Sequence, residues 1–101
     1  MSLTIVAHIN AKRGREALVF QELRNLIEPT RRENGCIQYD LYKDDNAPLH
    51  FLFFERWESR ELWRAHMNTP HFKAYQRSVE SAIDNFTVFE MSAAAEPFAA
   101  N

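Results

Sequence analysis

The segment Leu49–Trp57 constrains the fold most, because its composition predicts a strand that is apolar on both faces. Alternate side chains of a strand point to opposite sides of the sheet. One face is expected to carry Leu49, Phe51, Phe53, Glu55 and Trp57, and the other His50, Leu52, Phe54 and Arg56. A sheet that contains this strand therefore needs helices on one side and further protein on the other.

Three more strands and three helices are expected along the 101 residues. The predicted strands are Leu3–Asn10, Cys36–Lys43 and Phe86–Met91, and the predicted helices begin near Arg15, Ser59 and Pro70. One face of the second strand is expected to hold Ile37, Tyr39 and Leu41, and one face of the last helix Phe72, Tyr75, Val79 and Ile83. Each segment therefore has a predicted buried side.

Helix ends are also marked in the sequence. Pro29 is expected to bend the first helix, which ends near Asn34 before Gly35. Ser59 and Thr69 suit the N-caps of the other two helices. The order β-α-β-β-α-β predicts an α+β, ferredoxin-like domain with a four-stranded antiparallel sheet and helices on one face. We expect this single domain at residues 1–91, with an alanine-rich tail at residues 92–101.

Charge and cysteine content exclude several classes of function. Lys and Arg number 12 against 14 Asp and Glu, a formal charge of -2, so no nucleic acid or anionic membrane partner is expected. No apolar run is long enough to span a bilayer, and the N-terminus lacks the order of a signal peptide. Cys36 is alone, so we expect a small buried hydrophobe rather than a nucleophile, in a cytoplasmic protein.

The sheet face away from the helices suggests a partner. In a monomer it would expose Leu52 and Phe54, or Phe51 and Phe53, depending on the register. Soluble monomers rarely expose contiguous apolar patches larger than a few hundred Å². We therefore predict a homodimer that packs sheet to sheet.

Candidate proton-transfer residues gather in residues 55–75. His71 is the second residue of the helix that begins at Pro70, where the helix dipole favours a neutral imidazole that can accept a proton. The alternative is a surface or capping histidine. His66 either lines a pocket or is a core histidine bonded to backbone, and Tyr75, four residues after His71, either binds a substrate oxygen or packs in the core.

Aromatic side chains around these residues could form the walls of a pocket for a flat molecule. They are Trp57, Trp63, Phe51, Phe53 and Phe72, and each could equally be a core residue. Glu55 lies among them and needs a partner, such as Arg56 of another subunit; a structural ion pair is the simpler explanation. His8 is expected at the pocket mouth, although it could also be an ordinary exposed residue.

No metal site is expected from the spacing. His66 and His71 are five residues apart across a proline rather than four apart on one helix, and no third ligand is evident. No serine-hydrolase, phosphate-loop or Cys-His arrangement is visible either.

Three stretches resemble the antibiotic-biosynthesis monooxygenase family, especially its quinol monooxygenase branch. They are residues 33–36 with Tyr39, residues 55–59, and the run Ala65-His66-Met67-Asn68-Thr69-Pro70-His71-Phe72-Lys73-Ala74-Tyr75. The resemblance implies a dimeric α/β barrel and oxygenation of electron-rich aromatics with O₂, without metal or flavin. Deprotonation would make such a substrate electron-rich enough to reduce O₂.

The resemblance leaves the activity open among three classes. The favoured one is a cofactor-independent monooxygenase of a hydroquinone or polyphenol, with His71 and His66 handling protons. An isomerase of small carbonyl compounds would use the same histidines without O₂, and a dimeric binding protein would use only the aromatic cavity. The haem-degrading branch is disfavoured, because His66 and Gln76 stand where that branch has Trp and His.

Overall fold

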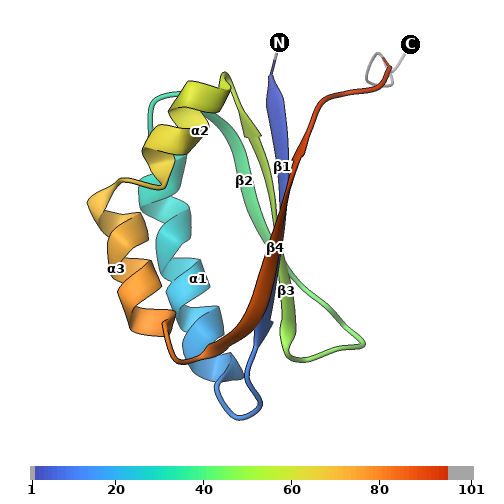
Figure 1. Ribbon diagram of the computed structural model, residues 1–101, viewed down its shortest axis with the longest axis vertical. Coiled ribbons are helices and arrows are strands. Elements are labelled where there is room, and N and C mark those ends of the chain that lie inside the picture. Colours follow the sequence, from blue (N-terminus) through green and yellow to red (C-terminus); the bar gives the residue numbers. More distant parts are fainter. Residues whose placement is uncertain (1, 96–101) are drawn as a thin grey trace.

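The computed structural model describes residues 2–95, which form one sheet and three helices (Figure 1). The elements are β1 (Leu3–Ala11), α1 (Glu16–Arg31), β2 (Cys36–Lys43), β3 (His50–Trp57), α2 (Arg60–His66), α3 (Pro70–Val79) and β4 (Ile83–Met91). The strands pair antiparallel in the order β2-β3-β1-β4, and the helices cover one face of the sheet. The predicted ferredoxin-like α+β fold is confirmed. Residues 96–101 of the predicted tail lie outside the described residues.

The pairing of β1 with β3 decides which residues face the helices. Ile5 lies opposite Glu55 and Ala7 opposite Phe53, so the odd-numbered residues of both strands share the covered side. Phe53 and Trp57 are at most 3% exposed there. The register therefore leaves Leu52 and Phe54, not Phe51 and Phe53, on the open side of the sheet.

Two predicted face assignments are wrong. A bulge between Cys36 and Gln38 removes Ile37 from the alternation of β2 and leaves it 43% exposed. Ile83 does not belong to the last helix, because α3 ends at Val79 and β4 begins at Ile83. Helix α1 also ends earlier than expected, at Arg31, two residues after Pro29.

The predicted caps fix the ends of the two short helices. Ser59 Oγ accepts a hydrogen bond from the Leu62 N–H, and Thr69 Oγ1 accepts one from the Phe72 N–H, each at 3.2 Å. Helix α2 ends at His66, and the Thr69 cap makes His71 the second residue of α3. The two histidines thus lie on either side of one short turn.

Gly35 allows a close approach between the α1–β2 loop and α2. Its φ is +87°, a left-handed conformation that favours glycine, and a Cβ at this position would clash with the side chain of Leu62. The loop therefore lies directly against α2. This contact places Glu33, two residues earlier, within reach of His66.

The open face of the sheet carries an apolar patch in the described residues. Its members are Val6 of β1, Leu52 and Phe54 of β3, and Phe89 and Met91 of β4. Phe89 is 43% exposed and Met91 is 47% exposed. None of the described helices is both long enough and apolar enough to cross a membrane.

Candidate functional site

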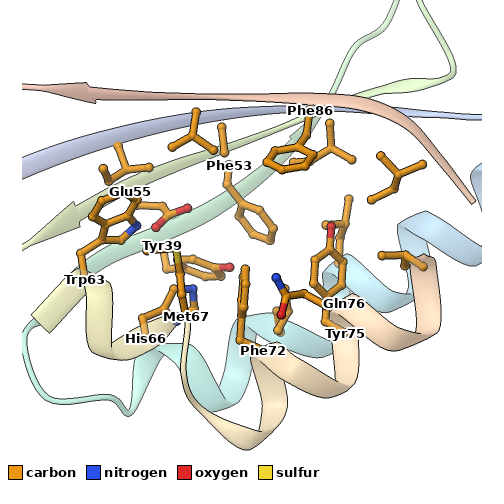
Figure 2. Close-up of a pocket in the computed structure, with 18 of the residues that line it drawn as sticks. Tyr39, Phe53, Glu55, Trp63, His66, Met67, Phe72, Tyr75, Gln76 and Phe86 are labelled. Carbon is orange, nitrogen blue, oxygen red and sulfur yellow. The ribbon is translucent and has the colours of Figure 1, made fainter. Parts of the chain in front are cut away.

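A cavity of about 690 Å³ lies between the sheet and the helices (Figure 2). This volume is within the range of ligand pockets in proteins. Phe53 and Phe86 approach it from the sheet, while Met67, Phe72 and Tyr75 approach it from the helical side. Most of the lining is apolar, so the cavity suits a molecule with a hydrophobic body and few polar groups.

Glu55 of β3 is a buried carboxyl in the cavity wall. It is 5% exposed, and the Trp57 Nε1–H donates a hydrogen bond of 2.9 Å to its Oε1. The pKa of Glu55 is raised to about 7, mainly by burial; the bond from Trp57 lowers it, and the negative charge of Glu33 raises it. Glu55 is therefore a carboxyl that can hold or release a proton near neutral pH.

The ion pair expected for Glu55 is not found in the described residues. Arg56 points to the other side of the strand, where its Nε donates a hydrogen bond to Gln38 Oε1 at 2.9 Å. The physical reason is the alternation of the strand, which separates residues 55 and 56. The partner of Glu55 in this chain is an indole, which leaves the carboxyl able to stay neutral.

His66, at the end of α2, also lines the cavity and is only 2% exposed. Its ring lies among aromatic neighbours, with centroids 4.9 Å from Phe72 and 5.0 Å from Trp57. Burial lowers the pKa of His66; the bond and charge of Glu33 oppose that shift, and His71 adds to it. The ring is therefore neutral at pH 7.

Glu33 determines which nitrogen of His66 carries the proton. His66 Nδ1 lies 2.8 Å from Glu33 Oε2, a distance at which the imidazole N–H donates to the carboxylate. Within the described residues Nε2 of His66 has no hydrogen-bond partner. A proton on Nδ1 leaves Nε2 as a free acceptor on a ring that lines the cavity.

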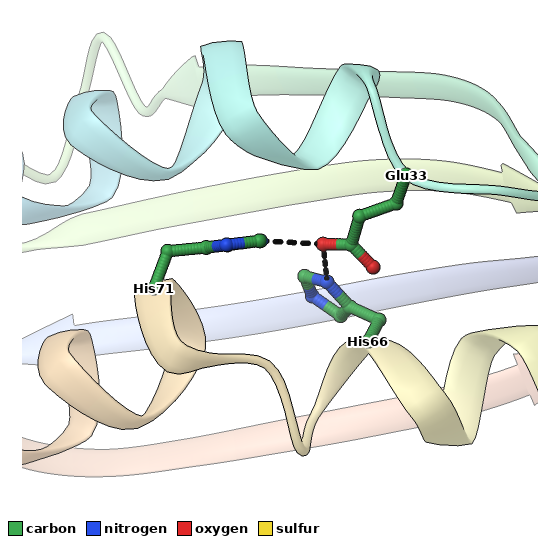
Figure 3. A group of neighbouring side chains, drawn as sticks. All are labelled: Glu33, His66 and His71. Carbon is green, nitrogen blue, oxygen red and sulfur yellow. Dashed lines mark hydrogen bonds and ion pairs between the residues drawn. The ribbon is translucent and has the colours of Figure 1, made fainter.

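His71 binds the same carboxylate oxygen from the other side (Figure 3). Its Nε2 lies 2.6 Å from Glu33 Oε2, and the His71 side chain is 26% exposed. His71 is not among the residues that line the cavity. Glu33, His66 and His71, here called the Glu33 cluster, thus place one histidine at the cavity and the other behind the carboxylate.

Glu33 was not among the candidate site residues found by pattern. It lies 33 residues before His66 and 38 before His71, so no short motif joins them. Its position just before Gly35, within a stretch that resembles the family, was the available signal. The backbone partner considered for a buried His66 is replaced by this carboxylate.

Glu33 is a possible third metal ligand that was not evident from the sequence spacing. The donor atoms of the Glu33 cluster all lie within 4.8 Å of one another. Two imidazoles and one carboxylate are a donor set that several divalent transition metals accept.

The remaining predicted residues divide between the cavity and other places. Phe53, Phe72, Trp63 and Tyr75 line the cavity. Burial raises the pKa of the Tyr75 phenol above its usual range, so the hydroxyl keeps its proton and can donate a hydrogen bond. Burial likewise raises the pKa of the Cys36 thiol to about 11, in keeping with a cysteine that packs against the core.

Two expected wall residues do not line this cavity. Trp57 is fully buried behind Glu55, and Phe51 stacks on Phe20 with ring centroids 5.6 Å apart. His8 is also absent from the cavity. It lies on the open face, where its Nδ1 is 2.8 Å from His50 Nε2, because β1 sends its even-numbered side chains away from the helices.

Comparison with known proteins agrees with the fold. Residues 2–78 match the family model described as "Antibiotic biosynthesis monooxygenase", which covers most of the chain. The chain belongs to this family. The resemblance carried by residues 33–39 and 55–75 is thereby confirmed.

Individual proteins match the chain over different lengths. "Probable quinol monooxygenase YgiN" of Escherichia coli (strain K12) is 29% identical over 91 residues, covering 80% of this chain and 88% of the relative. The uncharacterized protein sll1783 of Synechocystis is 33% identical over 73 residues, covering 72% of this chain but only 50% of its own length. The crystal structure of PA3566 from Pseudomonas aeruginosa is 34% identical, with a TM-score of 0.90 over 93% of this chain and 95% of that one.

Proposed function

We propose that this family member is a monooxygenase that oxidises a hydroquinone or a polyphenolic or polyketide aromatic with O₂ and needs no cofactor. One observation carries the proposal: His66 lines an apolar cavity while Glu33 holds its Nδ1 proton, which leaves Nε2 to accept a proton. The family match and the name of the E. coli relative support the reaction class.

The reaction begins when Nε2 of His66 takes a proton from a substrate hydroxyl. The resulting anion gives one electron to O₂, and the radical pair combines on a ring carbon. The peroxide anion so formed takes the proton back from His66 and becomes a hydroperoxide. Loss of water leaves one oxygen atom on the product and releases the other as H₂O. The substrate supplies all the electrons, so no outside reductant enters the balance.

Four other residues would support this step. Phe53 and Phe72 offer flat apolar surfaces on opposite sides of the cavity, and the Tyr75 hydroxyl can donate to a substrate oxygen. In this proposal His71 acts through Glu33: by donating to the same oxygen, it keeps the carboxylate in place. His66 is then the catalytic base and His71 a positioning residue.

A second candidate function is an isomerase of a small carbonyl compound. The observation that favours it is Glu55, whose pKa of about 7 would let it exchange a proton with a ligand on the cavity wall. Together with His66 it could move a proton between neighbouring carbons. Oxygen dependence separates this reaction from the monooxygenation.

We further propose a homodimer that buries the open face of the sheet. The apolar patch of Val6, Leu52, Phe54, Phe89 and Met91 supports it, since a second copy would cover Phe89 and Met91, which are 43% and 47% exposed in one chain. The cavity lies on the opposite side of the sheet and would remain accessible in such a dimer.

Oxygen uptake with freshly reduced quinols, menadiol among them, tests the proposed reaction. The assay compares active protein, heat-treated protein and no protein, with no metal or flavin added. We expect uptake well above autoxidation with at least one quinol. Uptake at the autoxidation rate across the panel would contradict the monooxygenase, and turnover of a carbonyl compound under nitrogen would favour the isomerase.

A further inference from the structure

We infer that the Glu33 cluster is a binding site for a divalent transition metal ion, with Zn²⁺ as its test ion, and that occupation prevents His66 from accepting a proton. The first part stands on the geometry of Glu33, His66 and His71 alone. The second part rests on the proposed function, in which His66 is the base.

The donor atoms already lie near the separations that one metal ion requires. Glu33 Oε2 is 2.8 Å from His66 Nδ1 and 2.6 Å from His71 Nε2, and all three atoms lie within 4.8 Å. Ligand bonds of about 2.0–2.2 Å put neighbouring donors of a tetrahedral ion about 3.3–3.6 Å apart. Small side-chain rotations would therefore bring the three atoms around one ion.

The surrounding fold holds the three residues of the Glu33 cluster in place. Its members come from the α1–β2 loop, α2 and α3, which the Gly35 contact and the two helix caps hold together. The side chains of His66 and Glu33 are 2% and 12% exposed, so neither is a freely moving surface group. His71, at 26%, offers the entry path from solvent.

Metal binding would change the protonation of both rings. Without metal, His66 Nδ1 and His71 Nε2 carry the protons that they donate to Glu33. A metal binds the lone pair of these same nitrogens, so each neutral ring must move its proton to the other nitrogen. The attraction between cation and carboxylate replaces the two lost hydrogen bonds.

For His66 this proton shift has a functional consequence. With a metal on Nδ1, the ring proton sits on Nε2, and the free acceptor becomes a donor. A ring in that state cannot take a proton from a substrate hydroxyl. The metal would therefore act as an inhibitor and not as the cofactor of the proposed reaction.

Calorimetric titration with Zn²⁺, after removal of metal by a chelator, tests the site directly. We expect one ion per chain, with at least tenfold weaker binding in Glu33→Gln and His71→Gln. The matched control is His50→Gln, which removes a histidine that also contacts a carboxylate but lies outside the cluster. Absence of binding, or equal loss of binding in His50→Gln, would overturn the site.

A measurement on the unaltered chain guards against variants that fail to fold. ¹⁵N NMR reports which nitrogen of His66 is protonated. We expect the proton on Nδ1 without Zn²⁺ and on Nε2 with it, whereas a proton that stays on Nδ1 at saturating Zn²⁺ would overturn the inference.

Measurements of oxygen uptake then test the inhibition by metal separately from the binding of metal. Zn²⁺ should inhibit the native chain over the concentration range of calorimetric binding. Uptake that continues at full rate with the site filled would overturn the inhibitory part. A chain that binds Zn²⁺ at the cluster but shows no oxygen uptake with any quinol would refute the proposed function and leave the metal site supported.

Discussion

Each side of the sheet has a cluster of two histidines and one carboxylate, but the two clusters are arranged differently. On the helical side, the Glu33 cluster converges on one point, because a single oxygen of Glu33 accepts hydrogen bonds from His66 and His71. His66 is 2% exposed, and one nitrogen of it remains free beside an apolar cavity.

On the open face, the corresponding groups form a row. Asp44 lies 2.9 Å from His50, which in turn lies 2.8 Å from His8, and the two rings stack with centroids 5.0 Å apart. The His50 side chain is 24% exposed, and the bond from His50 lowers the pKa of the Asp44 carboxyl. The same residue types thus give a surface chain of hydrogen bonds here and a buried proton acceptor on the helical side.

The comparison teaches that convergence and burial, rather than residue type, distinguish a candidate site. A carboxylate bound from two sides fixes both rings and excludes water from one of them. A row of partly buried groups has no single atom that all of them contact and does not line the cavity. Paired variants test this view, in order of decreasing expected effect, and the first two pairs place one residue on each side of the sheet.

Aspartate at two adjacent positions tests the two sides of β3. Phe53→Asp should lower the free energy of unfolding by roughly 4 kcal/mol or more, because it removes a buried ring and buries a charge. Phe54→Asp should leave the monomer folded but break the proposed dimer. Thermal unfolding and light scattering measure both, and a folded dimer for both variants would mean that the sheet faces are misassigned.

Removing one histidine from each side tests which of them handles protons. His66→Gln should lower the rate of quinol-dependent oxygen uptake about 10²- to 10⁴-fold, the usual range for loss of a general base. His50→Gln should change the rate little, since His50 lies outside the cavity. Circular dichroism of both variants checks the fold. Equal losses of rate in the two variants would show that Nε2 of His66 is not the proton acceptor of the reaction.

The pH dependence of stability tests the burial of Glu55. Its folded pKa of about 7 lies above the ordinary 4.5, so the protonated form contributes stability below pH 4.5 that is lost as pH rises through 7, on the order of 3 kcal/mol. The lowered pKa of His66 has the opposite effect on the free energy of unfolding. Its contribution to stability is present above pH 6.5 and is lost as the pH falls.

Comparison with Glu55→Gln isolates the contribution of the carboxyl. Urea unfolding at several pH values should show that the variant gains stability relative to the native chain between pH 4.5 and 7, up to about 3 kcal/mol. A difference between the two proteins that does not change with pH would contradict the raised pKa.

Alanine at two glycines with similar φ angles distinguishes the cost of backbone strain from the cost of losing the contact that positions Glu33. Gly14 has a φ of +85° with open space around it, whereas Gly35 has a φ of +87° against Leu62. Gly14→Ala should cost about 1 kcal/mol of stability from strain alone. Gly35→Ala should cost roughly 1–3 kcal/mol more, because the loop must move away from α2. Equal changes in unfolding free energy would argue against this contact.

Much of the fold could be predicted because its signals are local. The alternation in Leu49–Trp57 showed which side chains share a face, although not which face the helices cover, and Ser59 and Thr69 marked helix starts through bonds to residues three positions later. The errors arose where local patterns break. The bulge near Ile37 and the early start of β4 at Ile83 depend on how strands pair, which no single segment reveals.

The candidate site was predicted only in part. His66, Tyr75, Phe72 and Trp63 were expected and do line the cavity. His8 was placed wrongly, because the parity of β1 says which residues share a face but not which face the helices cover.

The sequence by itself determined the order of the elements, their caps and the set of aromatic and ionisable residues available for a cavity. These follow from interactions within a few residues of the chain. Only the tertiary structure decided that Glu33 meets two histidines more than 30 positions away, and that His66 lies beside the cavity while His71 lies behind the carboxylate. Such meetings depend on the packing of α1, α2 and α3 on one sheet, which is a property of the whole chain.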